Sequence, residues 1–241
     1  MASTSGRSSV HRPALFALAA DLRQIFGVGL HDLVAYGLER GSPEEPIHTL
    51  ALVQRVTFED LAACAPLVEG WQSAGLAVPL LISRNEFERT LDVFPLEYDA
   101  ILRDHTVIEG TDPFAGLRVA EPDLRRACEE QAKSHLIHLR ESFLEGRREP
   151  RAVSNLIAAS APVFRAVLLN IARLDGETDS ASEEGIAALA ERQIGIQATL
   201  VAEVLAYSRS ASAAADPTAL FARYLAASEQ VWNYVDRWRT E

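Results

Sequence analysis

The chain has 241 residues, of which 48% are hydrophobic and 24% charged, a composition typical of a globular protein with one large domain or two small ones. Its 34 acidic and 23 basic residues give a net charge of -11. This sign disfavours non-specific binding to nucleic acid, because phosphate contacts need clustered Lys and Arg. We therefore expect no nucleic-acid partner.

Residues 1–10 are rich in Ser and are predicted to be disordered. The apolar stretch at 14–20 is short and is followed at once by Asp21 and Arg23, which favours an amphipathic helix over about 13–26 rather than a signal peptide. No run of residues is judged long and apolar enough to cross a bilayer, so no membrane is expected. Cys64 and Cys128 lie far apart without metal-ligand spacing, which predicts buried free thiols and a cytoplasmic protein.

The first half of the sequence alternates between strand and helix patterns. Strands are predicted at about 30–36 and 47–55, and a capping pair, Thr57 and Asp60, begins a helix that ends near 74. A short strand follows at 78–82 and a short helix at 85–91. A fourth strand is predicted at about 93–102, and a fifth is compatible with 106–109. This alternation predicts a mixed sheet covered by helices over residues 11–110.

The second half is predicted to be helical over residues 111–241. Asp112 and Asp216 each precede a proline, as capping residues do at the start of a helix. Amphipathic helices are expected at about 122–146 and 151–174, from a cap at Ser180 to about 207, and from 217 to about 237. Pro162 should kink or split the second of these. The four helices predict a bundle, and the fold class is therefore α+β.

The segment from 30 to 53 carries the most informative pattern in the chain. An apolar strand ends at Tyr36-Gly37-Leu38, and a second strand begins near His48 after a polar loop. This layout resembles the nucleotidyltransferase superfamily that includes polymerase beta and the kanamycin nucleotidyltransferases. Residues 92–99 and the pattern of His105 with 110–113 resemble bacterial nucleotidyltransferase-domain proteins, so the similarity covers most of the chain.

The resemblance implies a Gly-Ser turn after the first strand, an Asp-x-Asp pair on the second and a third carboxylate on a later strand. Such carboxylates hold the Mg²⁺ that bridges the nucleotide phosphates. Here Leu38 stands where the family has Ser, and residues 46–52 include no Asp or Glu. Either His48 and Leu50 or Ile47 and Thr49 occupy the pair, depending on the register. We therefore expect a degenerate cleft at Tyr36, Gly37, Leu38 and His48, with no metal site.

Two other groups of residues could supply ligands. Glu97 and Asp99 lie two apart on the predicted fourth strand, so they would share a face, either as catalytic candidates or as a surface pair bonded to Arg103. With Glu44 or Glu45 they would give an active nucleotidyltransferase with relocated carboxylates, which would require Mg²⁺ and a nucleoside triphosphate as cofactors. His135, His138 and Glu141 have helical spacing, but packing is favoured over a metal site there.

The favoured function is a catalytically degenerate nucleotidyltransferase-like protein that acts as a ligand-binding or protein-interaction module, with no cofactor. Its expected partners are a nucleotide or another small molecule, a protein, or a second copy of the chain bound through the helical bundle. A third alternative is a structural, partner-binding helical protein. An exposed apolar patch around Trp232 and Trp238 would favour that alternative.

Overall fold

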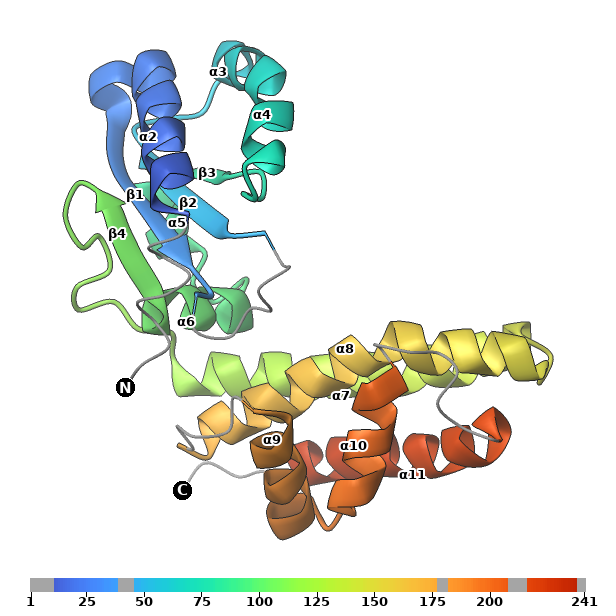
Figure 1. Ribbon diagram of the computed structural model, residues 1–241. Coiled ribbons are helices and arrows are strands. Elements are labelled where there is room, and N and C mark those ends of the chain that lie inside the picture. The colour runs from blue at the N-terminus through green and yellow to red at the C-terminus, as the bar shows by residue number, and fades with distance from the viewer. Residues whose placement is uncertain (1–10, 39–45, 177–181, 208–215, 238–241) are drawn as a thin grey trace. The chain divides into compact units, whose positions relative to one another are not determined.

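The computed structural model describes residues 11–38, 46–176, 182–207 and 216–237. The chain divides into two compact units, Met1–Ala120 and Glu121–Glu241. The first unit contains a mixed sheet with helices and the second is helical, which confirms the predicted α+β fold class (Figure 1). The division falls after Ala120, later than the boundary predicted at 110, and the segment predicted to be disordered lies outside the described residues.

The described part of the first unit forms a four-stranded sheet in the order β3-β2-β1-β4. The strands are β1 (Leu30–Tyr36), β2 (His48–Val53), β3 (Leu80–Ser83) and β4 (His105–Glu109). β1 is antiparallel to both β2 and β4, whereas β2 and β3 are parallel. The two strands predicted around Gly37 are therefore confirmed, and β1 lies inside the sheet with a partner on each side.

One face of the sheet is covered by α2 (Arg12–Phe26), α3 (Phe58–Cys64) and α4 (Val68–Ser73). The predicted capping pair is confirmed as a reciprocal box, because Thr57 Oγ1 accepts the Asp60 N–H and the Asp60 carboxylate accepts the Thr57 N–H. The Trp71 indole N–H donates to Asp21 over 2.8 Å and joins α4 to α2. Alternate strand residues complete this core, which includes Leu15, Leu18, Leu22, Leu33, Ala35, Ile47, Ala51 and Val53.

The predicted strand at 93–102 is wrong, because this segment forms the helix α6 (Pro95–Arg103). Proline suits the first helical turn, where its missing N–H leaves no bond unmade. Tyr98 and Ile101, three residues apart, are both buried, which is the spacing of a helix face. The Tyr98 ring centroid lies 4.5 Å from that of Phe87 in α5 (Arg84–Arg89). The apolar residues of this segment therefore lie on one face of a helix rather than on alternate sides of a strand.

Residues 110–114, which we call the strap, follow β4 and return over the sheet face opposite α2. The predicted helix cap at Asp112 is instead the start of a turn, in which its carboxylate accepts the Phe114 N–H over 2.9 Å. Phe114 is buried against the Phe87 ring, with centroids 5.1 Å apart. These contacts hold the strap within the first unit.

The second unit contains two long helices, α7 (Glu121–Glu145) and α8 (Pro150–Leu174), close to the predicted bounds. The predicted third helix is interrupted at Gly195 (φ +84°), giving α9 (Glu183–Leu189), a π-helical turn (Ala190–Ile194) and α10 (Ala198–Tyr207). Ser182 caps α9, and Ser180 lies outside the described residues. The predicted Asp216 cap of α11 (Pro217–Asp236) is confirmed, whereas α8 continues through Pro162 without being split.

Helix α8 corrects the expectation that no run could cross a bilayer. Among the described residues, it is the one helix long and apolar enough by length and composition to span a membrane, with a mean hydropathy of 1.6. The central helix of a globular unit passes the same test. In this unit α8 contacts α7, α9, α10 and α11, and its buried residues include Val153, Ile157, Phe164, Leu168 and Ile171. The structure buries 39% of the most apolar window of this helix, so packing within the helical unit explains part of its apolar character.

The strap generates a test of backbone packing. Gly110 has a φ of +88°, and a Cβ there would lie 2.4 Å from Asp32 Oδ1 and 2.6 Å from the His31 carbonyl oxygen. Gly116 has a similar φ of +81°, but a Cβ there meets no described atom within 4 Å. We expect Gly110→Ala to lower the free energy of unfolding by at least about 2 kcal/mol, more than Gly116→Ala, because backbone strain is joined by a clash. Thermal unfolding followed by circular dichroism measures both, and equal losses would contradict this packing.

Candidate functional site

The glycine bend lies directly after β1, where Gly37 has a φ of +70° that L side chains rarely adopt. Its N–H donates to the Asp104 carbonyl over 3.1 Å, which ties the bend to the residue before β4. Leu38 is buried in the core with residues of α2. The predicted site therefore has its turn, but the side chain after the glycine points inward and is not offered to a ligand.

His48 and Leu50 on β2 lie on the same face of the sheet as Tyr36. The sequence leaves open which two residues occupy the positions of the Asp-x-Asp pair, and this pairing identifies them as His48 and Leu50. His48 lies opposite Tyr36, and their rings stack with centroids 5.6 Å apart and planes at 28°. Leu50 follows on the same face and is fully buried. Ile47 and Thr49 point to the opposite face, where Ile47 joins the core under α2. The residues beside the bend are thus an exposed imidazole and a buried leucine.

The neighbouring strands add no carboxylate to this face beside the bend. Leu80 on β3 pairs with Leu50, and His105 on β4 pairs with Tyr36. Paired residues point to the same face, so His48, Tyr36 and His105 form a row across β2, β1 and β4. Burial raises the pKa of Tyr36, which keeps its phenol neutral. The row offers aromatic surface and imidazole nitrogens in place of the oxygen ligands that Mg²⁺ requires.

The shared face proposed for Glu97 and Asp99 is wrong, because both residues lie on helix α6. Residues two apart on a helix are separated by roughly 200° around its axis, so their carboxylates diverge. The alternative pairing is present in helical form, since Arg103 Nε donates to Asp99 Oδ2 over 2.7 Å. Glu44 and Glu45 lie outside the described residues. Within the described residues, no group of three or more His, Cys, Asp or Glu could hold a metal ion.

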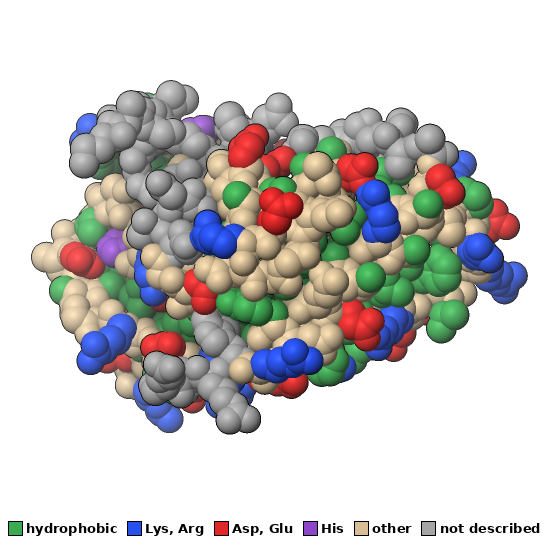
Figure 2. All heavy atoms as spheres, turned by 90° about the horizontal axis from the view of Figure 1, so that it is seen from below, with side chains coloured by type: hydrophobic (Ala, Val, Ile, Leu, Met, Phe, Trp, Pro, Cys, Tyr) green, Lys and Arg blue, Asp and Glu red, His purple; other side chains and the backbone are tan. Residues whose placement is uncertain are grey.

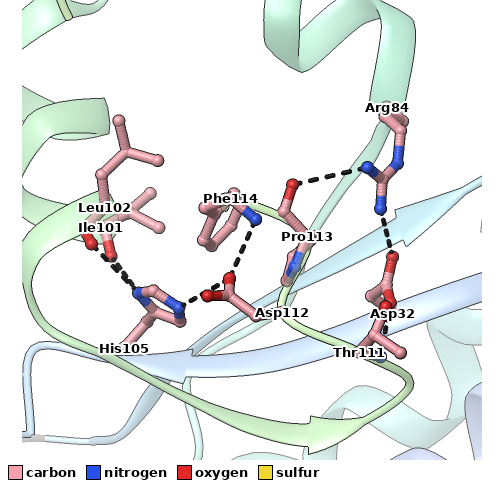
Figure 3. A network of polar contacts seen from close by, with 9 residues as sticks. All are labelled: Asp32, Arg84, Ile101, Leu102, His105, Thr111, Asp112, Pro113 and Phe114. Carbon is pink, nitrogen blue, oxygen red and sulfur yellow. Dashed lines mark hydrogen bonds and ion pairs between the residues drawn. The ribbon is translucent and has the colours of Figure 1, made fainter. Parts of the chain in front are cut away.

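A buried carboxylate that the sequence analysis missed lies on the same face of β1. Asp32 accepts the Thr111 N–H at Oδ1 and Arg84 Nη2 at Oδ2, both over 2.9 Å (Figure 3). Arg84 also donates to the Pro113 carbonyl over 3.4 Å. Both carboxylate oxygens are therefore engaged in holding α5 and the strap to β1. The signal in the sequence is a single charged residue inside an otherwise apolar strand, but its partners cannot be read from spacing.

His105 belongs to the second network drawn in Figure 3. Its Nδ1–H donates to the carbonyls of Ile101 and Leu102, at 3.1 and 3.2 Å, because neither carbonyl can donate. Its Nε2 lies 3.3 Å from Asp112 Oδ1, a contact that becomes an ion pair when the ring is protonated. This side chain therefore joins α6, β4 and the strap, and its role is positioning.

His135 and His138 differ in burial and in bonding partner, and among the described residues they belong to no group that could hold a metal ion. His135 is buried, and its Nε2 lies 2.9 Å from the hydroxyl of Tyr224 on α11. His138 is exposed beside Glu141, with Nδ1 3.3 Å from the carboxylate. Burial, with a smaller contribution from His138, lowers the pKa of His135 to about 4. Burial also raises the pKa of Tyr224, so both groups are neutral at pH 7.

Cys64 and Cys128 are both buried and free, as predicted. Burial raises the pKa of each thiol, to about 12 for Cys128, which keeps them protonated at neutral pH. A nucleophilic thiolate is therefore disfavoured at either position.

The surface of the helical unit around Trp232 is partly covered. Lys133 Nζ lies 3.3 Å from the Trp232 ring centroid, a cation–π contact that shields the indole, and Trp238 lies outside the described residues. On the face drawn in Figure 2, acidic and basic side chains are interspersed. The described residues that line the hollow beside Trp232 are mostly charged or polar, and they include Arg126, Glu129, Glu130, Lys133 and Asp236.

Comparison with known proteins adds no family assignment. No protein-family model matches the chain, and no curated protein matches it. The nucleotidyltransferase resemblance therefore rests on the residues around the glycine bend and on the downstream patterns.

The neutral state of His135 generates a test of pH dependence. The unfolded chain takes up a proton near pH 6.5, whereas folded His135 resists protonation until about pH 4. The free energy of unfolding should therefore fall as the pH falls through this window, by up to roughly 3 kcal/mol from this residue alone. His135→Phe should remove that part of the slope, and His138→Gln should keep most of it because burial is the larger cause. Urea unfolding at several pH values measures this, and equal slopes for wild type and His135→Phe would contradict it.

Proposed function

We propose that this protein is a nucleotidyltransferase-like module that works by binding a ligand or partner, without transferring a nucleotidyl group. The observation that carries the proposal is the identity of the two side chains beside the glycine bend. His48 and Leu50 share the face of Tyr36, at the place where the resembling enzymes hold Mg²⁺ between two carboxylates. An imidazole and a buried leucine supply none of the oxygen ligands that Mg²⁺ requires there.

The chemistry of the remaining acidic groups supports the same proposal. Asp32 is the carboxylate of β1 on this face, and both of its oxygens already accept hydrogen bonds from Arg84 and Thr111. Binding a metal through Asp32 would break its hydrogen bonds to Arg84 and Thr111, which hold α5 and the strap to β1. Glu97 and Asp99 diverge on α6. The hypothesis of an active nucleotidyltransferase with relocated carboxylates needed these two side chains to share a face, so it loses that support.

What remains beside the bend suits recognition. His48 is exposed and stacks on Tyr36, so it presents a flat aromatic surface at the end of the sheet. Stacking of this kind accepts a planar heterocycle such as a nucleotide base, and it needs no metal ion. The ligand class in this proposal is accordingly a nucleotide or another small planar molecule, with a protein partner as the alternative occupant.

The proposal is tested by thermal unfolding of the full chain with ATP or GTP, each with Mg²⁺ and with a chelator. We expect any stabilisation by a nucleotide to be equal in the two conditions, since the cleft supplies no metal ligand. His48→Ala should abolish that stabilisation, whereas His31→Ala, an exposed histidine at the other end of β1, should leave it unchanged.

A parallel incubation with α-³²P-labelled ATP or GTP asks whether the chain labels itself or an added acceptor. We expect no label to be transferred. Mg²⁺-dependent transfer, or stabilisation that requires Mg²⁺, would overturn the proposal and restore the active enzyme as the better reading.

A further inference from the structure

The helical unit contains a pocket of about 300 Å³ between α7 and α8, separate from the glycine bend. Its walls include Leu139, Leu156, Ala159 and Val163, and His135 and Ser160 also line it. This volume is at the lower end of the range for small-molecule sites in proteins. Its ionisable lining residues are the histidines His135 and His138, with no Asp, Glu, Lys or Arg, so the lining favours a neutral ligand over an ion that would have to give up its hydration.

Two polar residues of the pocket, His135 and Ser160, belong to a hydrogen-bond chain with a defined direction, and the other polar lining residues are Gln131, Ser134, His138 and Ser142. Ser160 Oγ–H donates to the Leu156 carbonyl over 2.7 Å, and this leaves its oxygen as an acceptor. The Tyr224 hydroxyl donates its single proton to Ser160 Oγ over 3.2 Å. The 2.9 Å contact between His135 Nε2 and the same hydroxyl must therefore be an N–H donated by the histidine. The neutral ring carries its proton on Nε2 and has a lone pair on Nδ1.

This lone pair has no partner among the described residues. His135 is only 6% exposed, and among the described residues its side chain bonds to Tyr224 alone, through Nε2. Nδ1 has no bonding partner, but it is not fully enclosed by the described residues, so a small probe can reach it. The ring lines the pocket, which is the open space that the described residues leave beside it. The ring is also neutral at pH 7, since burial holds its pKa at about 4.

We propose that the α7–α8 pocket binds a small, neutral, largely apolar molecule that donates one N–H or O–H hydrogen bond to His135 Nδ1. The apolar walls supply most of the favourable contact, and the hydrogen bond to His135 Nδ1 orients the ligand. The proposal does not rest on the nucleotidyltransferase resemblance, because every residue that carries it lies in the helical unit.

The first test uses indole and benzofuran with the full chain. The two bicyclic probes have nearly the same outline, but indole has an N–H donor where benzofuran has a ring oxygen. Indole should bind roughly five-fold more tightly than benzofuran, the ratio expected for one net hydrogen bond. Binding is followed by NMR with ¹⁵N-labelled histidine, and the Nδ1 resonance of His135 should shift with indole and remain nearly unchanged with benzofuran.

Two substitutions of equal surface exposure locate the site. Val163 lines the pocket and is 41% exposed, and Ile137 on α7 is 40% exposed but lies outside the pocket. Val163→Trp should fill the pocket and weaken both probes at least ten-fold, whereas Ile137→Trp should leave their affinities unchanged. His135→Phe should remove the preference for indole, and circular dichroism checks that each variant remains folded.

Several results would overturn the proposal. The two probes could bind with equal affinity, indole could still bind the Val163→Trp variant, or neither probe could bind at millimolar concentration. NMR spectra of the free protein that place the His135 proton on Nδ1 would also contradict it. The last measurement needs no ligand and no variant, so the proposal stays testable even where a substitution disturbs folding.

Discussion

The buried carboxylate of Asp32 is the interaction on which the first unit depends. It lies on β1, which has a strand partner on each side, and it binds the α5 guanidinium of Arg84 and the backbone of the strap at Thr111. Burying a carboxylate in a sheet is unfavourable by several kcal/mol unless charge-assisted hydrogen bonds replace its hydration. Here both oxygens of Asp32 accept hydrogen bonds, so its burial is compensated. The same bonds fix the positions of β1, α5 and the strap. The absence of a side chain at Gly110 makes this possible, because any Cβ would occupy the space of the Asp32 carboxylate.

This arrangement changes how the acidic residues of the fold are interpreted. A carboxylate on the ligand-facing side of β1 would ordinarily be read as a candidate for catalysis or metal binding. In this chain its oxygens are committed to structure, while the positions nearest the glycine bend carry histidine, tyrosine and leucine. The contrast supports the proposal that the sheet face is a platform for recognition, with the buried carboxylate of Asp32 used to hold that platform in shape.

The sequence predicts those elements whose signals are local. Strands β1 and β2, the capping box at Thr57 and the Asp216 cap all follow from residues within a few positions of each other. The helix α6 is missed because its short apolar pattern fits alternation as well as a helical face, and only the packing of Tyr98 against Phe87 decides between them. The site is less predictable than the fold. Arg84 lies 52 positions from Asp32, and Tyr224 lies 89 positions from His135, so neither pairing leaves a spacing signal.

The helical unit shows the same logic applied to a neutral network. His135, Tyr224 and Ser160 are polar groups set among packed apolar residues, and leaving any of them unpaired would cost about 1–3 kcal/mol. The chain from His135 through Tyr224 and Ser160 to the Leu156 carbonyl satisfies each donor in turn. Such a chain has a direction, because a carbonyl at one end can only accept, and that direction leaves an acceptor at the other end. This network ends on the second nitrogen of a histidine that lines an open pocket. The unpaired acceptor is therefore the feature of the helical unit that packing alone does not explain, and a donor from a ligand would complete it.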